Sequence, residues 1–349
     1  MNSIKLIIFI LVIFLKTGNV LSETSLFNVN NVEIISDLSR SNQNLANQAI
    51  KKGFKELINK VLLEKDLVKL ENLKFNQIKS LVSYYQISES VENRKEQNIK
   101  KIYNIFFDKG KVHDLFYRFE ISYSDISQYE IYFLPVHKKE DELYIYNQNY
   151  FYIKWNEVTQ NELIEYIFPL EKIEILQSIN NYKDNLINID IRNIFQEYSK
   201  KNYALVIIEE NKLGANKIFL KTNIMGKNVN KSIVLEKKYS NKNEFYEDII
   251  YKTNKQIINL VKSQNLIDIR TPSFINIRFL LDKKNNLVEL DNRLKKIDLI
   301  ENLYVQEFNK QYVLLKIKYL GKINKIIDQL KNQNILLEIK NDQWSLKII

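Results

Sequence analysis

The stretch VLLKIKYLGKINKIIDQLKNQNILLEI, residues 313–339, shows most clearly how part of this chain folds. Alternating apolar residues predict a strand from Tyr312 to Tyr319, and apolar residues at helical spacing predict a helix from Ile323 to Gln333. Gly321 lies between them, where the chain must turn sharply. Ile335 to Ile339 predicts a further strand. This regular order of elements indicates a compact unit in which helices and strands mix.

The flanking segments extend the same pattern on both sides. Upstream, the sequence predicts a strand at Phe274 to Leu281, a helix at Leu287 to Ile297 and a strand at Leu299 to Phe308. Residues 271–349 are therefore predicted to form a C-terminal domain, a βαββαβ ferredoxin-like split unit. Trp344 to Ile349 is expected to add a last edge strand to its sheet.

The middle region, residues 141–270, is predicted as a second α+β domain. Its tyrosine-rich start, Leu143 to Trp155, is typical of a strand. The later expected elements are a helix at Asn161 to Tyr166, a strand at Ile173 to Leu176, a helix at Asp190 to Lys200, a meander of strands at Ala204 to Glu209, Lys217 to Ile224 and Lys231 to Tyr239, and a helix at Phe245 to Val261.

Residues 23–140 are predicted as an N-terminal α+β domain. The expected elements are a strand at Leu26 to Ile35, a long helix from Ser41 or Asn42 to Leu62, a short helix at Ile78 to Val82, strands at Tyr84 to Ser90 and Lys100 to Asp108, a helix at Val112 to Phe119, and a closing strand at Tyr129 to Val136. The predicted fold class is thus α+β, with three small mixed domains in series.

Residues 1–22 have the order of a secretory signal peptide. Lys5 supplies a positive charge, Leu6 to Leu15 is an unbroken run of 10 apolar residues, and Val20-Leu21-Ser22 suits a cleavage site. A membrane span needs about twenty apolar residues, so cleavage is expected and a retained anchor is the alternative. No stable membrane span is expected after cleavage. The predicted location is the periplasm, with the cell surface and the medium as alternatives.

Composition limits the possible stabilising forces and partners. The chain has no cysteine, so stability must come from burial of apolar surface rather than from disulfides. The net charge of +10 arises from lysines that stand singly or in pairs, as in Lys51-Lys52 and Lys237-Lys238. Because they form no basic stripe, we interpret the charge as a compositional bias of an AT-rich genome and expect no specific nucleic-acid partner.

Catalytic and metal-binding patterns are absent from the sequence. A nucleophile activated by histidine would need His113 or His137, and neither lies in a recognisable nucleophile motif, so both are predicted as surface residues. There is no HExxH, no CxxC and no glycine-rich phosphate loop. We therefore predict a protein that is not an enzyme, with no catalytic, cofactor-binding or metal-binding residues and no cofactor.

Two acidic clusters and one aromatic cluster allow other interpretations. Glu209-Glu210 and the Glu140 to Glu142 cluster could serve as paired carboxylates of a glycosidase, although solvated charge explains both. The aromatic cluster, Tyr144, Tyr146, Tyr150, Phe151 and Tyr152, could form a stacking surface, but packing against a neighbouring helix is the favoured interpretation. Trp155 and Trp344 are expected to pack in the same way.

Several of these segments resemble a known family. The helix LANQAIKKGFKELINKVL (45–62), the strand VSYYQI (82–87), the segment IFFDKGKVHDLF (105–116) and the C-terminal order VLLKIKYLG, INKIIDQL, ILLEI and WSL resemble domain-of-unknown-function family 2066. That family comprises exported proteobacterial proteins, and the resemblance implies no catalytic residues. The element order of the middle region is similar to that of the N-terminal domain of the translocation protein TolB, an analogy of fold alone.

These observations predict an exported, non-catalytic envelope protein that binds another protein as an adaptor or scaffold. Trp344 to Ile349 could pair with a partner, an unknown envelope protein, by strand addition. The alternative is an envelope glycan hydrolase that acts through carboxylates, or a glycan-binding module. The sequence does not specify the oligomeric state.

Overall fold

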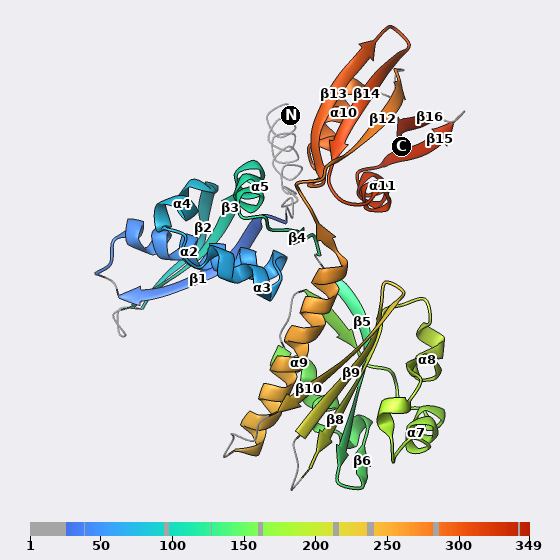
Figure 1. The fold of residues 1–349 in the computed structure, drawn as a ribbon. Helices are drawn as coiled ribbons and strands as arrows, with labels where there is room; N and C mark the ends of the chain where they lie inside the picture. The colour runs from blue at the N-terminus through green and yellow to red at the C-terminus, as the bar shows by residue number, and fades with distance from the viewer. Residues whose placement is uncertain are drawn as a thin grey trace, which may run out of the picture. The chain divides into compact units, whose positions relative to one another are not determined.

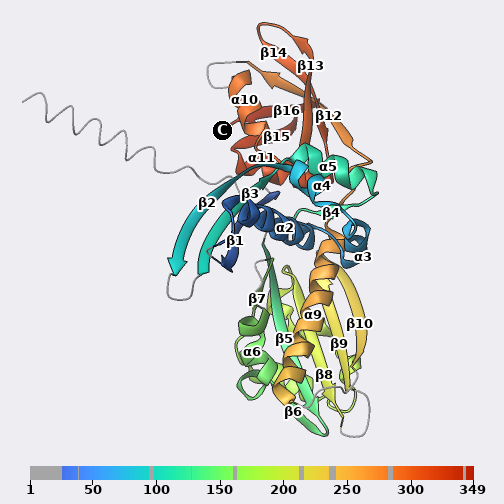
Figure 2. The same ribbon diagram turned by 90° about the vertical axis from the view of Figure 1, so that its left-hand side faces the viewer.

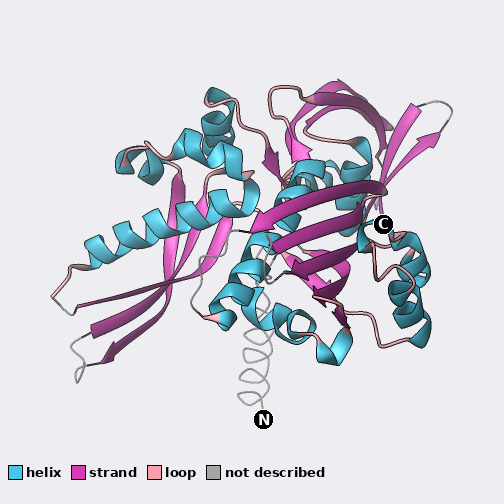
Figure 3. Cartoon of the chain, turned by 60° about the horizontal axis from the view of Figure 1, so that its bottom comes forward, coloured by secondary structure: helices cyan, strands magenta, loops and turns pink. Residues whose placement is uncertain are grey.

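The computed structural model describes residues 26–37, 39–93, 98–126, 128–159, 163–211, 216–235, 241–281, 286–340 and 343–349. The predicted signal peptide lies outside these residues. The chain has an α+β fold, and helices alternate with strands of several sheets (Figure 3). It forms two compact units. Unit 1 contains the described residues up to Leu57, Lys74–Tyr117 and Asp268–Ile349, and unit 2 contains Ile58–Leu73 and Arg118–Ile267.

The first sheet of unit 1 is antiparallel, with the order β1-β3-β2. Its elements and neighbouring helices are β1 (Asn28–Asp37), α2 (Asn42–Val61), α4 (Phe75–Ser80), β2 (Val82–Asn93), β3 (Asn98–Phe107) and α5 (Lys109–Arg118). The predicted apolar stripe of α2 is confirmed, since Leu45, Ala49 and Leu57 are buried. Gly53 permits a close approach, because a Cβ there would lie 2.6 Å from Cδ1 of Ile105 on β3.

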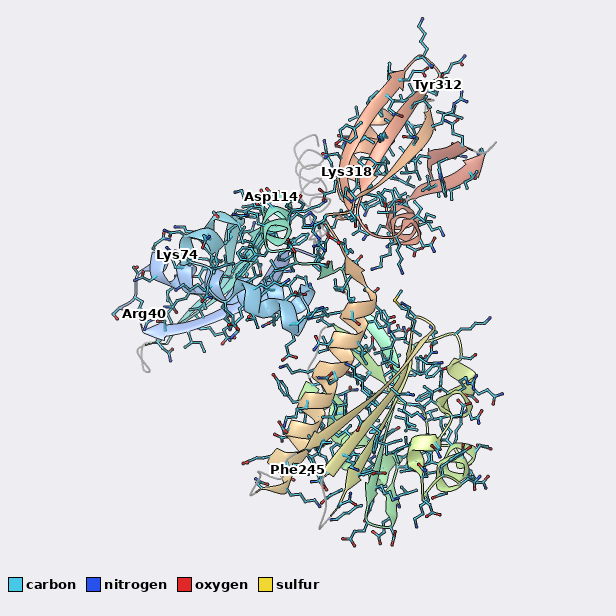
Figure 4. All side chains as sticks on the ribbon, in the orientation of Figure 1. Arg40, Lys74, Asp114, Phe245, Tyr312 and Lys318 are labelled. Carbon is cyan, nitrogen blue, oxygen red and sulfur yellow. The ribbon has the colours of Figure 1, made fainter. Side chains whose placement is uncertain are left out.

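The second sheet of unit 1 has the order β13-β14-β12-β16-β15. Its strands and helices are β12 (Ser273–Leu280), α10 (Leu287–Leu294), β13 (Ile300–Phe308), β14 (Tyr312–Tyr319), α11 (Ile323–Asn332), β15 (Ile335–Lys340) and β16 (Gln343–Ile348). All seven predicted elements of this region form. At the free end of the β13–β14 hairpin, the Arg278 guanidinium lies 4.1 Å from the ring centroid of Tyr312, which Figure 4 labels.

The prediction that the terminal strand is an edge strand is wrong. β16 lies between two strands, parallel to β12 with Ile277 opposite Trp344, and antiparallel to β15 with Leu337 opposite Leu346. β15 runs in the direction of the fourth strand of a ferredoxin-like unit, but β16 is inserted beside β12. Burial accounts for the inner position of β16. Leu346 and Ile348 on β16 are buried, whereas Ile339 on β15 is exposed.

Unit 2 is built on a sheet of order β10-β9-β8-β5-β6, with β7 also paired to β5. The strands of this sheet are β5 (Tyr129–Lys139), β6 (Glu142–Tyr144), β7 (Ile164–Ile167), β8 (Tyr203–Glu210), β9 (Asn216–Ile224) and β10 (Lys227–Leu235). Two short strands, β4 (Tyr123–Ser124) and β11 (Leu266–Ile267), pair with each other. The predicted meander β8-β9-β10 is confirmed. Residues 236–239 of its predicted third strand lie outside the described residues.

Helices cover both faces of this sheet. The helices of unit 2 are α3 (Glu64–Leu67), α6 (Tyr150–Thr159), α7 (Ile173–Asn180), α8 (Ile191–Ile194) and α9 (Lys242–Gln264), with short 3₁₀ turns η1 (Val68–Leu70), η2 (Tyr146–Gln148), η3 (Leu186–Asn188) and η4 (Gln196–Tyr198). α6 and α9 share one core with the sheet, and α7 and α8 share a second core on the opposite face. Figure 1 shows α9 running along the sheet. Among the described helices, none is both long and apolar enough to span a membrane.

The strand predicted to close the N-terminal domain belongs instead to this sheet. β5 pairs with β8 in parallel, with Phe133 opposite Ala204. Phe133 contributes to one core of unit 2 and Leu134 to the other, so β5 is buried on both faces as an interior strand. The predicted boundary at residue 140 falls within the β5–β6 hairpin, where Lys139 pairs with Glu142.

Four further predictions for the middle region are wrong. The tyrosine-rich segment predicted as a strand contains helix α6, because Phe151 and Trp155 are four residues apart and both reach the core. Its high content of β-favouring tyrosine was therefore misleading. The strand predicted at Ile173 is helix α7, and the described part of the helix predicted at Asn161 to Tyr166 forms β7. The helix predicted from Asp190 is broken into α8 and η4.

Candidate functional site

His137, predicted as a surface residue, is buried in unit 2. Its Nε2 lies 3.2 Å from Oε2 of Glu210, the last residue of β8. The Tyr246 hydroxyl of α9 donates to the same oxygen at 2.7 Å. The imidazole is surrounded by the rings of Tyr144, Phe151 and Tyr246, with centroid distances of 5.2–5.7 Å. Because β5 and β8 are parallel, their carboxyl ends bring His137 and Glu210 together.

Electrostatics assigns a protonation state to each member of this network. Burial lowers the pKa of His137, which favours the neutral imidazole. Burial also opposes ionisation of Glu210, but the Tyr246 hydrogen bond, the Lys139 and Lys242 ammonium groups and His137 lower its pKa overall. Burial and the adjacent carboxylate raise the pKa of Tyr246, which remains a hydrogen-bond donor. This network ties β5, β8 and α9 together, and a ring buried to this degree is poorly placed to act as a base on a substrate.

The network predicts that acid destabilises the protein. The pKa of His137 in the folded state is below 6.5, so the unfolded chain takes up this proton first as the pH falls. Glu210, with a pKa below 4.5, acts in the same direction at lower pH. We expect the free energy of unfolding, measured by urea denaturation, to decrease from about pH 7 to about pH 5, and to decrease less in His137→Phe. An equal decrease in both proteins would contradict the assignment.

His113 is also buried, so its prediction as a surface residue is wrong. It lies on α5 of unit 1, and its Nδ1 is 2.9 Å from Oε1 of Glu301 on β13. This hydrogen bond lowers the pKa of Glu301 although burial of the carboxylate opposes the shift. The imidazole also meets the Phe27 ring edge-on, with centroids 5.2 Å apart. Both histidines therefore belong to separate structural networks.

The two acidic clusters meet at the ends of β5 and β8, where the Glu140 N–H donates to the carbonyl oxygen of Glu210 at 3.3 Å. Glu210 belongs to the His137 network, and Glu142 accepts a hydrogen bond from the Tyr144 hydroxyl. Glu209 lies opposite Lys217 across the β8–β9 pair. No group of His, Cys, Asp and Glu side chains that could hold a metal ion occurs among the residues that the structure describes.

The aromatic cluster packs against the sheet of unit 2. Phe151 is buried and Tyr150 partly buried at one core, while Tyr146 is buried and Tyr152 partly buried at the other. Trp155 is buried and Trp344 is partly buried. The interpretation of the cluster as packing is confirmed, although the packing residues lie on η2 and α6 rather than on a strand.

The edge of β2 is the most direct candidate for a binding site. β2 is 12 residues long and, in the part of the chain that the structure describes, pairs with β3 alone (Figure 2). One row of its backbone N–H and C=O groups therefore has no strand partner. Such a row can template the addition of another strand.

Side chains along β2 add apolar surface to this edge. Tyr84, Tyr85, Ile87 and Val91 are each 40–52% exposed. Tyr84 stacks on Phe106 of β3, with ring centroids 4.3 Å apart, so this aromatic pair is held in place. Apolar side chains along an unpaired strand are the features that an added strand recognises. We call this surface, Val82–Val91, the β2 edge.

Sequence reasoning found this strand but not its free edge. The prediction of a strand at Tyr84 to Ser90 is confirmed, but strand addition was assigned to Trp344 to Ile349, which lies inside its sheet. The sequence contains a signal for the exposed strand, because Tyr84 and Tyr85 are adjacent and side chains of adjacent strand residues point to opposite faces. A strand with apolar residues on both faces and one free edge needs further cover.

Comparisons with known proteins assign neither a family nor a function to this chain. No family model matches the chain, and no curated protein matches it. The resemblance to domain-of-unknown-function family 2066 and the analogy to TolB therefore stay predictions. A solved structure described as "Crystal structure of uncharacterized protein" aligns with a TM-score of 0.18 and 10% identity, over 39% of this chain and 90% of that chain. A likeness of this strength supports no conclusion about fold or function.

Proposed function

We propose that this is an exported, non-catalytic protein of the bacterial envelope that binds another protein by strand addition at the β2 edge. The observation that supports the proposal most directly is the 12-residue strand β2 with an unpaired outer side and four exposed large apolar side chains. Main-chain hydrogen bonds to an added strand would supply affinity. Contacts with alternate side chains would supply specificity.

The other parts of the proposal rest on separate observations. Export rests on the signal-peptide pattern of residues 1–22, and the periplasm is the proposed location. The non-catalytic role is supported by the burial of both histidines in networks with carboxylates. The proposed partner is an envelope protein that contributes an extended segment with apolar residues at every second position.

The β2 edge predicts a specific effect of one substitution. Ile87→Lys places a charge where the added strand would pack, and charged edge residues oppose strand addition. Loss of one buried isoleucine corresponds to about 1.5–3 kcal/mol, so we expect binding to weaken about tenfold or more. The measurement is photocrosslinking from a probe at position 85 of the tagged chain in an envelope extract, with the crosslinked peptide identified after a high-salt wash.

A matched control lies on a different edge strand. Val234 on β10 is also exposed, and Val234→Lys is expected to leave crosslinking from position 85 unchanged. Thermal unfolding would show that both variants fold. Crosslinking that Ile87→Lys does not reduce, or an equal yield from a probe at position 234, would disprove the role of the β2 edge. A crosslink to a second copy of the chain would also overturn the adaptor proposal.

A further inference from the structure

Unit 2 contains a cleft that belongs neither to the β2 edge nor to the His137 network. Its volume is about 590 Å³, within the 300–1,000 Å³ range of small-molecule sites. It is lined by the segment from Pro169 to Ile175 at the start of α7 and by residues of α8 and η4. A smaller hollow of about 310 Å³ shares Glu171 with the cleft and is also lined by Asn147 and Asn180.

The walls of the cleft are held by contacts between its elements. Lys172 before α7 pairs with Glu197 of η4, which joins the two sides. Tyr198 lines the cleft and stacks on Tyr132 of β5, with ring centroids 4.0 Å apart. Ile175 belongs to the buried core beneath α7 and also lines the cleft. The aromatic ring is therefore positioned by the sheet rather than by a loop alone.

The polar lining has a particular chemistry. Glu171 and Glu174 offer carboxylate acceptors, while Asn193 and Gln196 offer amides that both donate and accept hydrogen bonds. Tyr198 adds an amphipathic ring. Lys172 is the cation among the lining residues, and its ammonium pairs with Glu197. The lining holds three carboxylates, Glu171, Glu174 and Glu197, against this single ammonium, so it disfavours phosphates and acidic sugars.

We propose that this cleft binds a neutral oligosaccharide. Sugar hydroxyls donate to carboxylates and amide oxygens and accept from amide N–H groups, which matches the lining described above. The C–H face of a pyranose ring is apolar and packs against an aromatic ring such as that of Tyr198. The second hollow beside Glu171 extends the site by a further amide-lined space. This proposal is independent of strand addition at the β2 edge.

The test uses the purified mature chain and neutral trisaccharides of glucose and of N-acetylglucosamine. We expect saturable binding of at least one trisaccharide by calorimetry, with an affinity that changes little with salt because the ligand is uncharged. Tyr198→Ala and, separately, Glu171→Gln are each expected to weaken binding about tenfold, the equivalent of one 1.4 kcal/mol interaction. Tyr198→Phe, which keeps the ring, is expected to retain most of the affinity.

Control variants distinguish binding at the cleft from nonspecific effects of substitution. Tyr251→Ala removes an exposed tyrosine of α9 in the same unit and is expected to leave binding unchanged. Because Glu171→Gln changes no packed ring, it keeps the test decisive if Tyr198→Ala fails to fold. Absence of saturable binding to both trisaccharides would overturn the proposal. Binding of spermidine instead, with affinity that falls steeply with salt, would also overturn it and identify a site for cations. Neither result would affect the β2 edge, since no protein partner is present.

Discussion

Trp155→Ala is expected to lower the free energy of unfolding by about 3–5 kcal/mol, the usual range for truncating a buried large aromatic residue. Trp155 is fully buried. Its ring centroid lies 4.3 Å from that of Phe133 and 5.8 Å from that of Tyr166. The substitution would leave a cavity between α6 and the sheet, which the surrounding rings cannot fill without moving. Urea denaturation followed by circular dichroism measures the effect.

Ile153 offers a control on the same helix. It is 52% exposed, so Ile153→Ala is expected to change stability by no more than about 0.5 kcal/mol. If the two alanine variants were equally stable, α6 would not pack against the sheet as described. That result would also contradict our explanation for why Leu143 to Trp155 was wrongly predicted as a strand, which is that Trp155 packs in the core from a helix.

Lys262→Met is expected to lower the free energy of unfolding by about 1.5–3 kcal/mol, the range for hydrogen bonds made by a charged group. Lys262 of α9 is buried, and its ammonium donates to the carbonyl oxygen of Leu62 at 2.9 Å and to that of Asn59. These carbonyls lie at the C-terminal end of α2, where the last helical turn lacks intrahelical donors. Methionine preserves much of the side-chain volume but cannot donate.

The same substitution has a distinctive pH dependence. Burial lowers the pKa of Lys262 from 10.5 to about 8. Between these values the unfolded chain binds more protons than the folded protein, so this group makes the protein more stable as the pH rises. The stability difference between wild type and Lys262→Met should therefore widen from about pH 7.5 to about pH 9.5. A difference that narrows over this range would contradict the assignment.

Lys255 is the matched control for Lys262 because it lies on the same helix and its side chain is 43% exposed. Its ammonium pairs with Glu64 at 2.7 Å. Exposed ion pairs contribute about 0.2–1 kcal/mol, so Lys255→Met should have the smaller effect. Urea denaturation of both variants at the same pH values compares a buried ammonium with an exposed one in one helix.

Local periodicity predicted many of the regular elements of this chain but not their pairing. The C-terminal strands and helices, the β8-β9-β10 meander and α9 carry clear apolar patterns, and all of them form. The position of β16 depends on its partner β12, which lies more than 60 residues away in the chain, so no local pattern could reveal it. β5 was assigned to the wrong domain for the same reason, since its partner β8 is also distant.

The candidate sites show the same limitation. His113 and His137 looked like surface residues because their carboxylate partners are 188 and 73 residues away in the sequence. The lining of the cleft comes from segments on either side of η3, and the start of α7 was predicted as a strand at Ile173 to Leu176. A polar residue is recognised as buried only when its partner is known, and that information is tertiary.

Unit 1 is built from three separate segments of the chain, and this has a consequence for how the chain folds. The amide of Leu26 bonds a carboxylate oxygen of Asp298 at 3.0 Å, a contact that closes a loop of 272 residues. During synthesis, the first strands and α2 leave the ribosome long before this acceptor exists. Loop-closure entropy grows slowly with length, by about 0.6 kcal/mol for each doubling, so the delay limits the rate of folding more than the final stability. All of unit 2 is encoded within this loop, so its sheet can form before the last segment of unit 1 has been synthesised.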